Sequence, residues 1–83
     1  MPVKVLLFGK AAELAGKKET FLEVHGEIRY ETLLSNVFDS LPELNTIREN
    51  CVIAVDQKYG STNEWFHIKD NTEIAIIPPL SGG

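Results

Sequence analysis

The stretch Ala75-Ile76-Ile77-Pro78-Pro79-Leu80-Ser81-Gly82-Gly83 closes the chain, and the rest of the fold is best understood from it. Small and β-branched residues form a strand pattern that runs into two prolines, which supply no N–H donors for sheet pairing. We therefore expect the last strand to end at Ile77. Beyond the prolines, four residues at ~3.5 Å each could carry the terminal carboxylate on the order of 14 Å outward. That reach is enough to enter the active site of another protein.

Glycine at the last two positions has a physical use. Without a Cβ, Gly82 and Gly83 can thread a channel too narrow for other residues, and they leave the terminal carbonyl carbon open to a nucleophile or to an ATP α-phosphate. Glycine-rich ends are also often frayed segments without a role. Here the glycines follow a strand and a stiff proline pair in register, which favours a functional tail.

Length and composition predict a single domain over residues 1–83 with a flexible C-terminal tail at 78–83. Such a short chain buries roughly 60% of its unfolded surface, which allows one core. Apolar residues make up 43% and charged residues 24% of the chain, which is typical of a globular protein. The formal net charge of −4 disfavours nucleic acid and anionic membranes as partners.

The sequence contains a single cysteine, Cys51. It allows no intramolecular disulfide, which fits a reducing compartment. The first residues have neither the apolar run of a signal peptide nor the Arg-rich pattern of a transit peptide, and no segment is long and apolar enough to span a membrane. We therefore expect a cytosolic (cytoplasmic) protein.

Hydrophobic periodicity predicts strand, strand, helix, strand, short strand and strand, at residues 3–8, 19–25, 31–41, 51–55, 65–68 and 73–77. A short helical turn at Ala11–Ala15, closed by Gly16, separates the first two strands. The main helix has one apolar face and ends at Pro42. That face comprises Leu33, Leu34, Val37, Phe38 and Leu41.

This order predicts an α+β fold in which one main helix packs on one face of a mixed sheet. If the first and last strands are parallel neighbours, the tail leaves from the middle of the sheet. The face opposite the helix, bearing Phe8, Ala75 and Ile77, would then be partly bare. A single exposed apolar residue is ordinary, but Phe8, Tyr59 and Ile77 clustered on this face beside the tail would mark a docking surface. Phe8, Tyr59 and Ile77 are therefore the candidate partner-interface residues.

Other candidate chemistry has simpler explanations. Cys51 opens an apolar strand without a neighbouring base or cation, so we interpret it as a small buried hydrophobe rather than a nucleophile. His25 and His67 are far apart and lack ligand spacing, so we expect no metal site. The acidic pair Glu19 and Glu23 fits a solvated strand face, and no glycine-rich phosphate loop follows a strand.

Four segments of the chain resemble the small, sulfur-carrying subunit of molybdopterin synthase, most closely its animal members. They are Val3–Phe8, Glu13–Gly16, Ile53–Val55 and, above all, Glu73–Gly83 with its Pro-Pro-x-Ser-Gly-Gly ending. The resemblance runs nearly end to end and implies a β-grasp (ubiquitin-like) fold. The chain departs from the family pattern at Ala12, at Arg29-Tyr30, where the main helix lacks a Ser/Thr cap, and at Asn71-Thr72.

The resemblance also implies a mechanism. An E1-like adenylyltransferase/sulfurtransferase uses ATP to adenylate the Gly83 carboxylate, and a persulfide then converts it to a thiocarboxylate. The tail inserts into the large subunit, within a heterotetramer of two small and two large subunits, and gives its sulfur to cyclic pyranopterin monophosphate. Gly83 would be the reactive residue, and the inserting residues would be Pro78, Pro79, Leu80, Ser81 and Gly82. The chain would hold no permanent cofactor and would not be an enzyme by itself, since the catalytic residues would lie on the large subunit.

Three alternatives remain open at this stage. A ubiquitin-like modifier would attach to lysines through Gly83 and produce isopeptide-linked adducts. A sulfur carrier for thiamine synthesis or tRNA thiolation is the nearest relative in function, and the Pro78-Pro79 pair disfavours it. A β-grasp module that only binds would tolerate deletion of Gly82 and Gly83.

Overall fold

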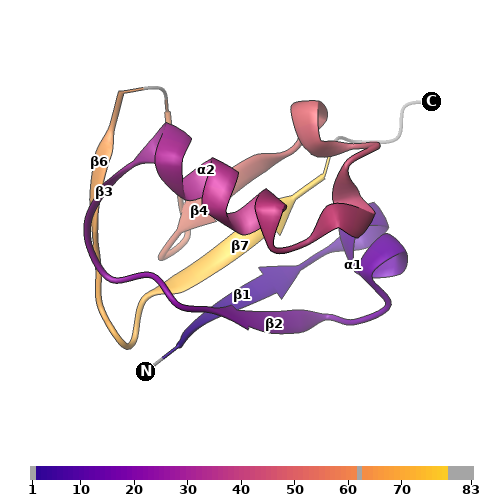
Figure 1. The fold of residues 1–83 in the computed structure, drawn as a ribbon, viewed down its shortest axis with the longest axis horizontal. Coiled ribbons are helices and arrows are strands. Elements are labelled where there is room, and N and C mark those ends of the chain that lie inside the picture. The colour runs from indigo at the N-terminus through magenta and orange to yellow at the C-terminus, as the bar shows by residue number, and fades with distance from the viewer. Residues whose placement is uncertain (1, 62, 79–83) are drawn as a thin grey trace.

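The computed structural model describes residues 2–61 and 63–78 and arranges them around a five-stranded mixed sheet (Figure 1). The strand order is β2-β1-β7-β4-β5, and β3 and β6 form a separate two-stranded sheet. The strands are β1 (Val3–Leu7), β2 (Glu19–Leu22), β3 (Gly26–Arg29), β4 (Val52–Val55), β5 (Lys58–Tyr59), β6 (Trp65–Ile68) and β7 (Glu73–Ile77). The helices are α1 (Gly9–Ala15) and α2 (Tyr30–Asp39), with the 3-10 turns η1 (Pro42–Leu44) and η2 (Arg48–Asn50).

The last strand occupies the centre of the large sheet. β7 pairs in parallel with β1, where Val5 lies opposite Ile74, and antiparallel with β4, where Ile53 lies opposite Ile76. β1 and β2 form the predicted antiparallel pair, with α1 in the connection between them. The predicted parallel neighbours and the central exit of the chain are confirmed. With α2 crossing one face of this sheet, the architecture is the predicted β-grasp fold (Figure 1).

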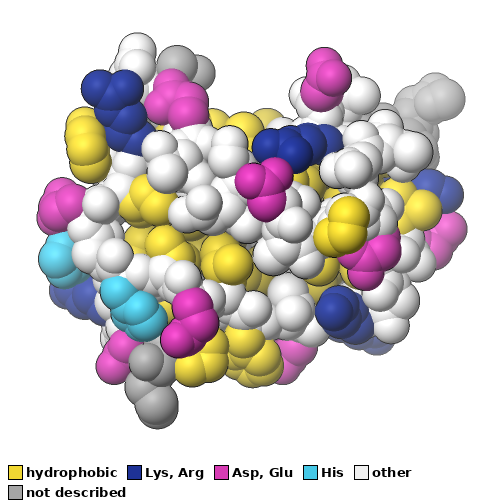
Figure 2. All heavy atoms as spheres, viewed as in Figure 1, with side chains coloured by type: hydrophobic (Ala, Val, Ile, Leu, Met, Phe, Trp, Pro, Cys, Tyr) yellow, Lys and Arg dark blue, Asp and Glu magenta, His cyan; other side chains and the backbone are white. Residues whose placement is uncertain are grey.

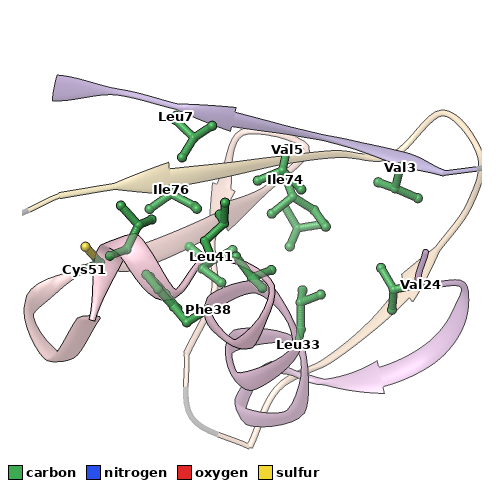
Figure 3. Close-up of a cluster of buried hydrophobic side chains, with 14 of the residues drawn as sticks. Val3, Val5, Leu7, Val24, Leu33, Phe38, Leu41, Cys51, Ile74 and Ile76 are labelled. Carbon is green, nitrogen blue, oxygen red and sulfur yellow. The ribbon is translucent and has the colours of Figure 1, made fainter. Parts of the chain in front are cut away.

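The core lies between the large sheet and α2. Strand alternation turns Val3, Val5, Leu7, Ile74 and Ile76 towards the helix, and each is at most 3% exposed. Figure 3 shows these side chains facing those that α2 and the segment after it contribute, among them Leu33, Phe38 and Leu41. Full burial of a side chain of this size stabilises the fold by about 1.5–3 kcal/mol. One face of the sheet is therefore committed to the core.

The helix ends follow the local sequence. α2 begins at Tyr30 without a side-chain cap, as the Arg29-Tyr30 pair predicts. Its last turn is closed by the Ser40 hydroxyl, which donates to the Val37 carbonyl oxygen at 2.7 Å. α1 ends as predicted at Gly16, whose φ of 72° is readily adopted by glycine.

Two predicted strands differ from those observed. The strand expected at 19–25 ends at Leu22, and Gly26, with φ 88°, begins the unpredicted strand β3. β6, expected as an edge-like strand, pairs with β3 rather than with the large sheet. The sequence 19–29 alternates almost without interruption, so its pattern did not reveal the change of direction that glycine permits.

The short edge strand β5 was also not predicted. It follows a two-residue turn in which Asp56 and Gln57 have φ of 51° and 70°, the left-handed values of a hairpin turn that usually contains Asn or Gly. After β5, Gly60 lies against the ring of Tyr30, and a Cβ built on Gly60 would lie 2.3 Å from Tyr30 Cδ1. The Tyr30 hydroxyl in turn accepts a hydrogen bond from the Ile53 N–H at 3.3 Å. These contacts fix the edge of the sheet against the start of α2.

The surface on the α2 side carries charged side chains of both signs, with apolar side chains showing between them (Figure 2). Across the part of the chain that the structure describes, no helix is both long and apolar enough to cross a membrane.

Candidate docking face and C-terminal tail

The three predicted interface residues lie together on the sheet face opposite α2, here called the open face. Phe8, Tyr59 and Ile77 line one groove of about 340 Å³. The groove also includes Leu6, Ala54, Gln57, Glu73 and Ala75. Phe8 itself lies just beyond β1, at the N-cap of α1, rather than inside the predicted strand at 3–8. Its backbone stays extended, and its side chain still reaches the groove.

Strand register explains the shape of the groove. Leu6 lies opposite Ala75, Ala75 opposite Ala54, and Ala54 opposite Tyr59, which makes one row across β1, β7, β4 and β5. The two alanines in the middle of the row are small, whereas larger side chains stand at both ends. A row of this kind leaves a hollow whose floor is apolar, because cross-strand neighbours share one face of the sheet.

The open face carries most of the large apolar side chains exposed on the described residues. Phe8, Phe21, Val52 and Tyr59 are 47%, 55%, 41% and 65% exposed, and only Trp65 of this group lies elsewhere, on the two-stranded sheet. Phe21 and Val52 were not predicted as site residues. Phe21 was missed because it shares its strand face with Glu19 and Glu23, which indicated a solvated face. Val52 was missed because it lies in a continuous apolar run, which does not show which face is exposed. Apolar side chains gathered on one face mark an interaction surface.

A second hollow, of about 300 Å³, lies at the other end of the open face. Pro2, Lys4, Phe21, Asp70, Asn71, Thr72 and Glu73 line it. Lys4 Nζ lies 3.9 Å from Glu19 Oε1, and both side chains are about half exposed. Glu73 lines both hollows, so one carboxylate stands at the junction between a polar end and an apolar end of the face.

The chain leaves the groove at the end of β7. Ile77 is its last residue in the sheet, and the half-buried Pro78 lies beside Gly9, where a built Cβ would be 3.2 Å from Pro78 Cγ. With φ 52° as well, Gly9 suits this site better than any residue with a side chain. Residues 79–83 lie outside the described residues, so the roles predicted for Pro79, Leu80, Ser81, Gly82 and Gly83 stay predictions.

The other candidate residues have ordinary environments. Cys51 is 7% exposed, and burial raises the pKa of its thiol, which disfavours the nucleophilic thiolate. His25 Nε2 lies 3.0 Å from Asp70 Oδ1, and His67 Nδ1 lies 2.7 Å from Glu27 Oε2 on the neighbouring strand. Among residues 2–61 and 63–78, no three His, Cys, Asp or Glu side chains gather as metal ligands would.

Comparison with known proteins identifies the family. The sequence pattern of the ThiS family matches residues 5–83. The chain belongs to the ThiS family. Among the relatives of this chain, the molybdopterin synthase sulfur carrier subunit of Caenorhabditis briggsae is 44% identical over 81 residues, covering 98% of this chain and 96% of the relative. The subunit of the same name from Chlamydomonas reinhardtii is 40% identical over the full length of both chains.

A solved structure independently supports the fold of this chain. SAMP1 from Haloferax volcanii superposes with a TM-score of 0.76 and 21% identity, covering all of both chains. At this identity the likeness concerns the fold alone. The predicted β-grasp architecture and the predicted family resemblance are both confirmed.

Proposed function

We propose that this chain is the sulfur carrier subunit of a molybdopterin synthase and serves in molybdenum cofactor biosynthesis. The observation that carries the proposal is its similarity, from end to end, to relatives that bear this name in animals and in an alga. The family match continues to Gly83, so it includes the residues to which the chemistry is assigned.

In the proposed reaction, the Gly83 carboxylate attacks the α-phosphorus of ATP, releasing pyrophosphate and forming an acyl-adenylate. A carboxylate is a poor electrophile, and the mixed anhydride gives its carbon a leaving group. A persulfide on an E1-like activating enzyme then attacks this carbon and displaces AMP. Reductive cleavage of the resulting acyl disulfide by a thiol leaves the Gly83 thiocarboxylate. ATP and sulfur are thus transient, and the chain holds no permanent cofactor.

The open face and the tail act together in this proposal. The groove lined by Phe8, Tyr59 and Ile77 docks the large synthase subunit, and the tail from Pro78 to Gly83 enters that subunit's active site. The prolines are preset close to an extended conformation, which lowers the entropy lost on insertion. Catalytic acids, bases and cations belong to the large subunit, in a heterotetramer of two small and two large subunits in the cytosol.

A coupled reaction tests this function. The chain is incubated with an activating sulfurtransferase, ATP, a persulfide donor, the large subunit and cyclic pyranopterin monophosphate, and its intact mass is followed together with the dithiolene product. We expect oxygen to be replaced by sulfur at Gly83 and this form to be consumed as product appears. Omission of ATP and a chain lacking Gly83 are the matched controls.

The outcomes separate the rival functions. Thiocarboxylate without dithiolene product would move the chain to another sulfur pathway, such as thiamine synthesis or tRNA thiolation. Adducts joined through Gly83 to lysine side chains would instead favour a ubiquitin-like modifier. No mass change with enzymes that are active on a known carrier would contradict the proposed function.

A further inference from the structure

We infer that Glu73 is a specificity residue that pairs with a cationic side chain on the protein partner covering the open face. This inference rests on the proposed function, because it takes the large synthase subunit as that partner. Glu73 was not among the residues singled out from the sequence.

The position of Glu73 is central and fixed. It opens β7, the middle strand of the sheet, lies opposite Lys4 of β1, and lines both hollows of the open face. Its backbone N–H donates to Asp56 Oδ1 at 2.9 Å, and its carbonyl oxygen accepts from the Asp56 N–H at 2.8 Å. These two hydrogen bonds tie the first residue of β7 to the β4–β5 turn and so fix the position of the Glu73 side chain on the open face.

The charge of Glu73 is not balanced by an ion pair within residues 2–61 and 63–78. Lys4 on the neighbouring strand is instead paired with Glu19, at 3.9 Å. The Glu73 residue is already half-buried, and its groove neighbours include the apolar Leu6 and Ala75. Any partner that covers this face removes water from the carboxylate. Burial of an unpaired charge is strongly unfavourable, whereas a cation placed against it offsets the loss of water.

The partner surface follows from this arrangement. It should present apolar side chains to the hollow over Ala54 and Ala75, and an arginine or lysine to Glu73. From Glu73 to Ile77 the chain advances four residues at ~3.3 Å each, so the cation should lie about 13 Å from the point where the tail leaves the sheet. Neutral or acidic surfaces are rejected at the same position, because they leave the carboxylate buried and unpaired.

The test measures the affinity of the complete chain for the large subunit by calorimetry across a range of salt concentrations. Glu73→Gln keeps the size of the side chain and the backbone hydrogen bonds but removes the charge. We expect its Kd to rise about thirtyfold or more at low salt and to depend less on salt than that of the unaltered chain. Glu73→Asp, which keeps the charge, should retain most of the salt dependence. Circular dichroism checks that each variant is folded.

Glu43→Gln, in η1 and outside both hollows, is the matched control and should bind like the unaltered chain. Equal affinities for Glu73→Gln and the unaltered chain would overturn the inference while leaving the proposed function intact. Equal weakening by Glu73→Gln and Glu43→Gln would also overturn it, since net charge rather than position would then govern binding. Failure of the unaltered chain to bind the large subunit at all would overturn both proposals.

Discussion

Ile76 and Ile77 lie on opposite faces of β7, so substituting each in turn distinguishes a residue needed for stability from a residue needed for partner binding. Ile76 is fully buried against α2, whereas Ile77 is half-buried on the open face and lines the groove. Replacing each with glutamate makes the same chemical change one residue apart. Ile76→Glu should unfold the protein, and Ile77→Glu should leave it folded while weakening its binding to the large subunit.

The magnitudes follow from burial. A chain of 83 residues has a free energy of unfolding of about 4–12 kcal/mol. Truncating a fully buried isoleucine costs about 2–5 kcal/mol, and Ile76→Glu adds the burial of a charge without a partner. Ile77→Glu loses part of the apolar burial of the isoleucine but leaves the carboxylate in contact with water in the free chain, so we expect about 1–2 kcal/mol of destabilisation, less than for Ile76→Glu. In the complex the introduced carboxylate loses its water without gaining a partner, which costs about 1–3 kcal/mol and corresponds to a ~5- to 150-fold weaker Kd.

Urea unfolding followed by circular dichroism measures the first effect, and calorimetric titration with the large subunit measures the second. Ile47→Glu provides a control for binding, because Ile47 is another half-buried isoleucine and lies outside the groove. Its affinity should stay close to that of the unaltered chain. Unchanged affinity for Ile77→Glu, or unfolding of Ile77→Glu as complete as that of Ile76→Glu, would refute the assignment of the two faces.

Three further predictions concern the scaffold. Gly60→Ala places a Cβ against the Tyr30 ring and should lower the free energy of unfolding by about 1–3 kcal/mol, so an unchanged urea midpoint would contradict this packing. Burial raises the pKa of the Cys51 thiol, so the neutral thiol stabilises the fold until the pH rises through that raised pKa. A thiol reagent at mildly alkaline pH should therefore react much more slowly with the native chain than with the urea-unfolded chain. Equal reaction rates would argue against burial of Cys51. The Lys58 ammonium, 3.2 Å from the Glu64 carboxylate, holds the pKa of Glu64 below its usual range, so the stability that the ionised Glu64 contributes is lost as the pH falls through the lowered pKa. In an NMR titration the midpoint of Glu64 should rise in Lys58→Met. An unchanged midpoint would exclude Lys58 as the cause of the lowered pKa.

The large sheet, apart from its edge strand β5, could be predicted from sequence because the pattern within each strand agrees with the packing of the whole sheet. Successive side chains of Val3–Leu7 and Glu73–Ile77 alternate between the two faces, and the observed assignment buries Ile74 and Ile76 against the helix. The proline pair after Ile77 then marks the end of the last strand. The hydrophobic pattern of such strands specifies their pairing register, because only one of their faces is fully buried.

The two-stranded sheet could not be predicted in the same way. β3 depends on a change of direction at Gly26 and on pairing with β6, some forty residues later, and neither leaves a period in the sequence.

The edge strand of the large sheet, β5, also could not be predicted. It depends on Asp56 and Gln57 adopting left-handed φ values, which their residue types do not demand.

Only part of the candidate site could be predicted from the sequence, because some of its residues come together through the pairing of different strands. Phe8 and Ile77 were identified from strand parity and from their expected nearness to the tail, whereas Tyr59 lay in no predicted strand. Glu73 shares this face by the same parity, two residues before Ala75 in β7, whereas Phe21 joins it through the pairing of β2 with β1. The alignment of Lys4 with both residues is a tertiary fact, which the alternation within a single strand does not contain.

A single-turnover experiment tests the central claim most directly. The purified thiocarboxylate form of the chain is mixed with the large subunit and cyclic pyranopterin monophosphate, without ATP, activating enzyme or any other source of sulfur. The account predicts that the carboxylate form reappears, read by intact mass, with one dithiolene formed for every two carriers consumed. Persistence of the thiocarboxylate beside a competent large subunit, or its hydrolysis without any dithiolene, would contradict the role of Gly83 as the sulfur donor.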